Sequence, residues 1–176
     1  MLAFLLGAVG QSACASIYHA IDNDALESSG YWNVNYNNYY SYITGSSLWN
    51  GDARFRKSNG HQTYEYRHNS ITLGRRPTAE VRAYLNHNDF TDDNAKYLIK
   101  TNYVESATIG YIDQKYAAAG WNIAKDRNNK SKIVIDQPGT IIAYGVRVQS
   151  SGKGSDYGTG ADAVSVKYWK EGEVVS

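Results

Sequence analysis

The sequence has little of several features that commonly stabilise or target a protein. It contains one cysteine and two prolines in 176 residues, so no disulfide can form within the chain and the fold depends on side-chain packing. Eighteen Lys and Arg nearly balance seventeen Asp and Glu, which argues against a nucleic-acid binder, because such proteins usually carry a clear basic excess. The apolar run at 2–9 is far shorter than the roughly 20 residues that cross a membrane.

Aromatic residues, in contrast, are abundant. Sixteen Tyr accompany four Trp and three Phe, and 42 % of the residues are hydrophobic, which is enough to form the core of one domain rather than a disordered tail. Tyrosine combines a large apolar ring with a hydroxyl, so it suits strands and binding surfaces. An uncharged partner such as a polysaccharide fits the balanced charge better than a nucleic acid or a membrane surface.

The first fifteen residues resemble a secretory signal peptide. The apolar run at 2–9 is followed by the triplet Ala13-Cys14-Ala15, which matches the small-residue cleavage site of such signals. No Lys or Arg precedes the run, so the signal is shortened relative to the usual pattern, and a buried N-terminal strand or helix is the alternative. We expect a secreted, extracellular protein with residues 1–15 as signal peptide and 16–176 as a single domain.

The remaining sequence alternates between apolar and polar residues, with the period of two that is typical of strands. Turn signals at Asn50-Gly51, Asn59-Gly60 and Pro138-Gly139, and a mobile loop at 150–155, separate these segments. Only 115–119 suggests a short helix. About ten short strands with little helix predict an all-β fold, a jelly-roll β-sandwich. In segment 79–85 the alternation places Ala79, Val81, Ala83 and Leu85 on one face, with Glu80, Arg82 and Tyr84 on the opposite face. The clearest alternating segments are 31–36, 79–85, 132–136, 141–148 and 163–169.

Motifs of common enzyme classes are missing from the sequence. It contains no H-E-x-x-H, no G-x-S-x-G and no paired cysteines. Two carboxylates could hydrolyse a glycosidic bond, and a polysaccharide-degrading enzyme is therefore a third interpretation. We expect no enzyme, because the alternation places most of the candidate carboxylates on solvated strand faces. These candidates are Asp52, Glu65, Glu80 and Asp113.

A structural calcium ion is a further possibility. Asp22 and Asp24 lie near the first strand and Asp162 near the last, and carboxylate oxygens are the ligands that Ca²⁺ takes. The first and last strands of a jelly roll commonly lie side by side, so these groups could converge. The alternative is that the Asp and Asn side chains cap turns. No other cofactor is expected.

Several aromatic residues lie in Gly-, Ser- and Asn-rich segments instead of alternating strands. Sugar rings present C–H faces that stack on such side chains, while neighbouring polar groups bind the hydroxyls. The alternative is that these tyrosines fill the ends of the sandwich. Tyr84, Tyr144 and Tyr168 fall within strands and need only the fold to explain them. The expected binding residues are Tyr39, Tyr40, Tyr42, Trp49, Arg54, Asn88 and Asp89.

Four blocks of sequence carry a family resemblance. They are Ile21-Asp22-Asn23 with Gly30-Tyr31-Trp32; 79–84; 91–97 with Asp113-Gln114 and Gly120-Trp121-Asn122; and 161–164. Their order resembles the golvesin C-terminal-like domain, which also occurs as an accessory module of xanthan lyases. Ala79 departs from the pattern, since Tyr is usual there. We expect Trp32 and Trp121 to pack in the core.

This resemblance implies a galactose-binding-like β-sandwich with a non-catalytic role directed at carbohydrates or surfaces. The first interpretation is therefore a secreted module that binds a polysaccharide or cell-surface glycan. The alternative is a self-associating extracellular structural or adhesive subunit, in which exposed tyrosine-rich strand edges pair between copies.

Overall fold

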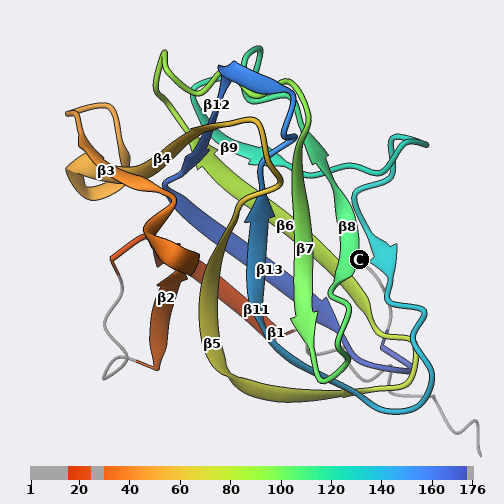
Figure 1. Cartoon of the computed structure of the whole chain (residues 1–176). Coiled ribbons are helices and arrows are strands. Elements are labelled where there is room, and N and C mark those ends of the chain that lie inside the picture. Colours follow the sequence, from red (N-terminus) through yellow and green to blue (C-terminus); the bar gives the residue numbers. More distant parts are fainter. Residues whose placement is uncertain (1–15, 25–29, 174–176) are drawn as a thin grey trace, which may run out of the picture.

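The computed structural model describes residues 16–24 and 30–173 (Figure 1). Strands account for 55 % of the structure and helix for 4 %. The predicted signal peptide at 1–15 lies outside the described residues. Nearly all of the regular secondary structure is β-strand, as the alternating segments predict.

The strands form three antiparallel sheets, with the smallest at the upper end of the molecule in Figure 1. The first contains β1 (Ser16–Asp22), β13 (Ala163–Trp169), β6 (Thr78–Leu85), β10 (Ile133–Val134) and β9 (Gly120–Ile123). The second contains β2 (Tyr31–Asn35), β5 (Thr63–Gly74), β11 (Ile141–Gln149), β7 (Ala95–Thr101) and β8 (Ala107–Ile112). The third contains β12 (Gly154–Ala161), β4 (Asp52–Ser58) and β3 (Ser41–Thr44), and two short 3₁₀ turns are η2 (Tyr36–Asn38) and η3 (Trp49–Gly51).

The first two sheets share one hydrophobic core. On β6 the predicted apolar face, Ala79, Val81, Ala83 and Leu85, is buried. The rings of His68 on β5 and Tyr168 on β13 meet edge to face across the two sheets, with centroids 5.7 Å apart. This packing confirms the predicted all-β sandwich, while its jelly-roll form stays a prediction. β1 pairs with β13, so the first and last described strands do lie side by side.

Tyrosines are a major part of this core. Tyr40, Tyr64, Tyr97 and Tyr168 are all fully buried. A buried hydroxyl needs a hydrogen-bond partner, and each of these has one. The hydroxyls of Tyr40 and Tyr64 donate to the carbonyls of Gln62 and Asn23 respectively. The hydroxyls of Tyr97 and Tyr168 lie 2.9 Å from Gln114 Nε2 and His68 Nε2 respectively.

Three local predictions need correction. Residues 115–119 form no helix, and side chains instead bond to their backbone: the Tyr116 N–H donates to Asp113 Oδ1, and the Ala118 carbonyl accepts from Asn122 Nδ2. The predicted loop at 150–155 ends early, since β12 begins at Gly154. Pairing with β4 holds this glycine-rich segment as a strand, a contribution that strand propensity does not capture. Of the alternating segment 132–136, only Ile133–Val134 pairs as a strand, namely β10.

Two residues of the sequence blocks, Asp92 and Gln114, have structural roles. The buried carboxylate of Asp92 accepts hydrogen bonds from the Ser151 N–H and the Thr159 hydroxyl. The side chain of Gln114 bonds to both the N–H and the carbonyl of Gly160. These contacts join β12 to the segments that flank β7 and β8, and so fix one end of the sandwich.

Candidate functional site

Three aromatic side chains from distant parts of the chain form a cluster, which we call the aromatic cluster: Trp49, Tyr84 and Trp121. The ring centroids lie 5.2 Å apart for Trp49 and Tyr84, 5.3 Å for Trp49 and Trp121, and 5.7 Å for Tyr84 and Trp121. All three pairs meet edge to face, which is a favourable arrangement for aromatic rings.

Two strands and one turn position these rings. Tyr84 on β6 is the direct partner of Trp121 on β9, and Trp49 begins η3. Trp121 is 39 % exposed, whereas Trp49 and Tyr84 are half-buried. The expectation that Trp121 packs in the core is therefore wrong: β9 is a short strand paired along one side with β6, and the ring lies on its outer face. Tyr84, whose presence the sequence pattern explains by the fold alone, is part of this surface as well.

A polar hollow of about 280 Å³ lies close in sequence to two residues of the cluster, although none of the three rings lines it. It begins where β6 ends and β9 starts, because Leu85 directly follows Tyr84 and Ala119 lies two residues before Trp121. Asn88, one of the expected binding residues, is among its lining residues, and the exposed Asp89 neighbours it in the loop. The lining residues are Leu85, Asn86, His87, Asn88, Phe90, Gln114, Lys115, Ala117 and Ala119.

Three other expected binding residues, Tyr39, Tyr42 and Arg54, make contacts on or near the third sheet. The guanidinium of Arg54 lies over the Tyr42 ring, 5.0 Å from its centroid, and the Tyr42 hydroxyl donates to Asp52 Oδ2 at 3.1 Å. Arg56 lies over the Tyr39 ring at 5.3 Å. Tyr42 is 53 % exposed, so its ring is accessible on the third sheet.

Tyr40 does not belong to this surface. Its side chain is 2 % exposed and packs against Tyr64, with ring centroids 5.5 Å apart. Both backbone polar groups of Tyr40 bond to the side chain of Asn35, which turns the ring inward. Its expected role in binding is wrong, and the alternative, that a tyrosine fills the end of the sandwich, holds for this residue.

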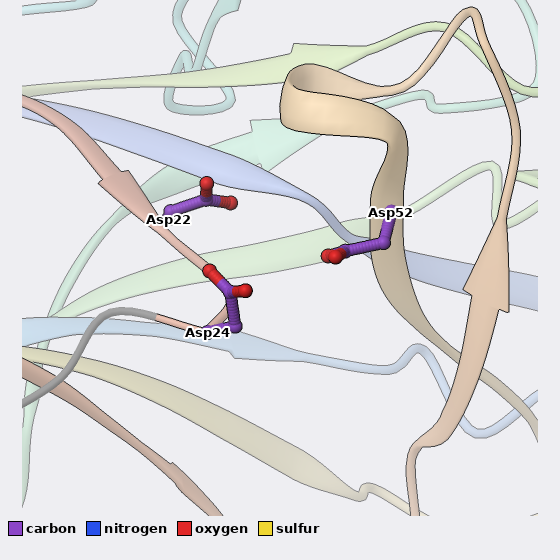
Figure 2. A group of neighbouring side chains, drawn as sticks. All are labelled: Asp22, Asp24 and Asp52. Carbon is purple, nitrogen blue, oxygen red and sulfur yellow. The ribbon is translucent and has the colours of Figure 1, made fainter.

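Acidic side chains meet beside the aromatic cluster. Asp22, Asp24 and Asp52 place their carboxylates within 4.8 Å of one another, and Figure 2 shows them pointing into a common space. Asp52 is one of the four candidate glycosidase carboxylates and is not among the residues predicted to bind calcium. Asp162, which was expected here, instead accepts hydrogen bonds from the Trp49 N–H. Burial, with the nearby charges of Asp22 and Asp52, raises the pKa of Asp162 to about 7.

A second hollow, of about 240 Å³, lies on the outer face of the second sheet. Trp32 and Tyr144 line it together with Glu65, Arg67 and Lys100. Trp32 is thus a half-buried surface residue and not a core residue, and Tyr144 lies on the same surface. Glu65 is 0 % exposed and pairs with Arg67 at 2.6 Å and with Arg147. The expectation that most of the candidate carboxylates are solvated fails for Glu65, because two arginines and their strands cover its carboxylate, and for Glu80, which is buried as well.

Comparison with known proteins adds no family to this picture. No family model matches the sequence, and no curated protein is significantly similar to it. Within residues 16–24 and 30–173, no helix is long and apolar enough to cross a membrane.

Proposed function

We propose that this chain is a non-catalytic carbohydrate-binding module and that the aromatic cluster is its binding surface. The observation that carries the proposal is the exposure of Trp121 within a group of three rings. The core already contains many buried aromatic residues, yet Trp49, Tyr84 and Trp121 meet at the surface, each reaching solvent. A rigid, partly exposed group of rings of this kind suits the apolar C–H face of a sugar.

Polar groups for the sugar hydroxyls lie in the hollow where β6 ends and β9 begins. Asn86, Asn88 and Lys115 line this hollow, and their amide and ammonium groups can donate to or accept from hydroxyls. At about 280 Å³ the hollow is at the small end of ligand sites, which start at roughly 300 Å³. A sugar ring stacked on Trp121 with hydroxyls in this hollow is the binding mode that we propose.

The resemblance to golvesin C-terminal-like domains supports the same function, because it implies a carbohydrate- or surface-directed role. Binding by one such site is weak, and several copies or several sites on one polysaccharide strengthen it. The near-balance of acidic and basic residues favours a neutral glycan over a strongly charged one.

The test is retention on insoluble polysaccharides, followed by a glycan array. We expect the wild-type chain to bind a glycan and Trp121→Ala to lose most of that retention. Trp32→Ala is the matched control, since Trp32 is also a half-buried surface tryptophan but lines the other hollow. Loss of binding in Trp32→Ala alone would place the site on the second sheet instead. Retention on no glycan, together with concentration-dependent oligomers, would favour the alternative of a self-associating extracellular subunit.

A further inference from the structure

The second hollow, on the outer face of the second sheet, combines aromatic rings with a surplus of positive charge. Trp32 and Tyr144 line it together with Arg67, Lys100 and Glu65. The rings supply apolar faces, and the charged side chains supply two positive charges against one negative charge. At about 240 Å³ the hollow suits a single small ring, because sites for larger ligands start at roughly 300 Å³.

The register of four neighbouring strands positions this lining. Trp32 on β2 is the direct partner of Arg67 on β5. Arg67 is paired in turn with Gly145 on β11, and Gly145 with Lys100 on β7, and these strands lie side by side in that order (Figure 1). Gly145 has no side chain, so no group of this row separates Arg67 from Lys100. Their backbones are two strand spacings apart, about 10 Å, and both side chains can reach one anion between them.

The negative charge of Glu65 is already compensated. Arg67 Nε lies 2.6 Å from Glu65 Oε1, and Arg147 pairs with Glu65 Oε2 from the neighbouring strand. The Tyr36 hydroxyl also donates to Oε2, at 3.1 Å. Two guanidinium groups therefore share one buried carboxylate, so an anion in the hollow meets a net positive charge even before Lys100 is considered.

Both cations of the hollow have donors left for a ligand. Lys100 takes part in none of the ion pairs of the described residues. Among the same residues, the Arg67 guanidinium uses Nε and Nη2 for its bonds to Glu65 and Tyr36, which leaves the two N–H donors of Nη1. The Arg67 side chain is 33 % exposed, so this group reaches solvent. Guanidinium and ammonium groups are the usual partners of a carboxylate.

We propose that the second hollow binds a carboxylate that is attached to a six-membered ring. The two carboxylate oxygens take the two donor groups, Arg67 Nη1 and Lys100 Nζ, and one face of the ring stacks on Trp32. An indole face packs well against either the C–H face of a sugar or an aromatic ring. This inference goes beyond the proposed function, because it concerns a different surface and a charged ligand and does not need the aromatic cluster.

The experiment is a titration of the ¹⁵N-labelled protein with sodium glucuronate and, separately, with sodium benzoate, followed by NMR. The four tryptophans give separate indole N–H signals, and the variant Trp32→Phe assigns the signal of Trp32. We expect each acid to shift this signal with a Kd of about 1–10 mM, because an exposed ion pair and one stacked ring each contribute modestly. Methyl glucoside and benzyl alcohol, which lack the carboxylate, should bind about fivefold more weakly. Tighter binding of glucuronate identifies the ligand as an acidic sugar, and tighter binding of benzoate identifies it as an aromatic acid.

Two lysines of β7 provide a matched pair of variants. Lys96 and Lys100 lie four residues apart on this strand, so both face the same side of the sheet. Lys100→Met and Lys96→Met each remove one positive charge from this face, but only Lys100 lines the hollow. We expect Lys100→Met to weaken the binding of both acids by about fivefold, whereas Lys96→Met should bind like the wild type.

Three results would overturn the proposal. The first is no shift of the Trp32 signal with either acid. The second is an equal effect of Lys96→Met and Lys100→Met, and the third is an equal shift with acetate, which has no ring. In these two cases the positive charge of the whole face, and not the hollow, would bind the anion. Glycan retention is tested at Trp121 and this binding at the Trp32 signal, so failure of one is distinguishable from failure of the other.

Discussion

The main-chain N–H of Trp49 donates to the carboxylate of Asp162, at 3.2 Å from Oδ1 and 3.0 Å from Oδ2, across 113 positions of sequence. Asp162 is the single residue between β12 and β13, so this hydrogen bond joins η3 to the junction of two sheets. It therefore ties the backbone of Trp49, a residue of the aromatic cluster, to the rigid part of the fold.

We expect Asp162→Ala to be less stable than Asp162→Asn by about 1 kcal/mol. Both variants remove the buried charge, but only Asn keeps an oxygen that accepts the Trp49 N–H. Urea unfolding of the two variants measures the difference. Equal midpoints would show that this hydrogen bond does not hold η3 in place.

The two tyrosines Tyr40 and Tyr42 should behave differently although they are neighbours in sequence. Tyr40→Ala is expected to cost about 3–5 kcal/mol, because it leaves a cavity in the core. Tyr42→Ala should cost about 1 kcal/mol, since it loses an exposed contact with Arg54 and a hydrogen bond to Asp52. Thermal melts compare them directly. A larger loss for Tyr42→Ala would contradict their placement.

Stability should fall in mild acid because of His68. Its buried ring lies 2.9 Å from the Tyr168 hydroxyl, and burial lowers its pKa below the usual 6.5. The unfolded chain therefore takes up a proton first as the pH falls below 6.5, so the stability that the neutral ring contributes is present above this pH and is lost below it.

The variant His68→Gln isolates this effect. The raised pKa of Asp162, about 7, acts in the opposite direction, so only the difference between the wild type and the variant is diagnostic. Between about pH 7.5 and about pH 5, the urea midpoint of the wild type should fall more, or rise less, than that of His68→Gln. The same pH dependence in both proteins would exclude His68 as its source.

Gly145 should tolerate no side chain. A Cβ there would lie 2.1 Å from the backbone oxygen of Tyr66 on β5, so Gly145→Ala has to move one strand away from another. We expect a loss of about 3 kcal/mol or more, or failure to fold. At Gly45 the nearest atom would be 3.6 Å away, and Gly45→Ala should change stability by about 0.5 kcal/mol or less. Chemical unfolding of both variants checks this, and similar losses would contradict it.

Sequence patterns alone were sufficient for much of the fold. The alternation of β6 correctly assigned Ala79 and Val81 to the core and placed Tyr84 on the opposite face with Arg82. This second assignment is the sequence signal for a surface position of Tyr84. Period-two alternation depends only on residues that are adjacent in the chain. It can therefore be recognised whichever strands pair with the segment.

The burial of single aromatic residues in polar segments does not follow from the sequence pattern, because long-range and side-chain contacts decide it. Tyr40 and Tyr42 lie in the same polar segment, yet the bonds of Asn35 to the backbone of Tyr40 direct one ring inward while the other remains exposed. The motif position of Trp121 is compatible with core packing as well as with sugar contact, and the structure leaves its ring accessible on the solvated outer face of a strand. The resemblance to golvesin C-terminal-like domains stays a prediction.

The sequence by itself therefore determined the all-β class, the buried face of β6 and the turns at Asn50-Gly51 and Pro138-Gly139, where positive φ angles confirm it. These features depend on neighbouring residues only. The tertiary structure alone decided that Trp49, Tyr84 and Trp121 meet, and that Asp52 rather than Asp162 joins Asp22 and Asp24. Such groups depend on which distant strands pair and on where each turn is held, and these long-range contacts are absent from any local pattern.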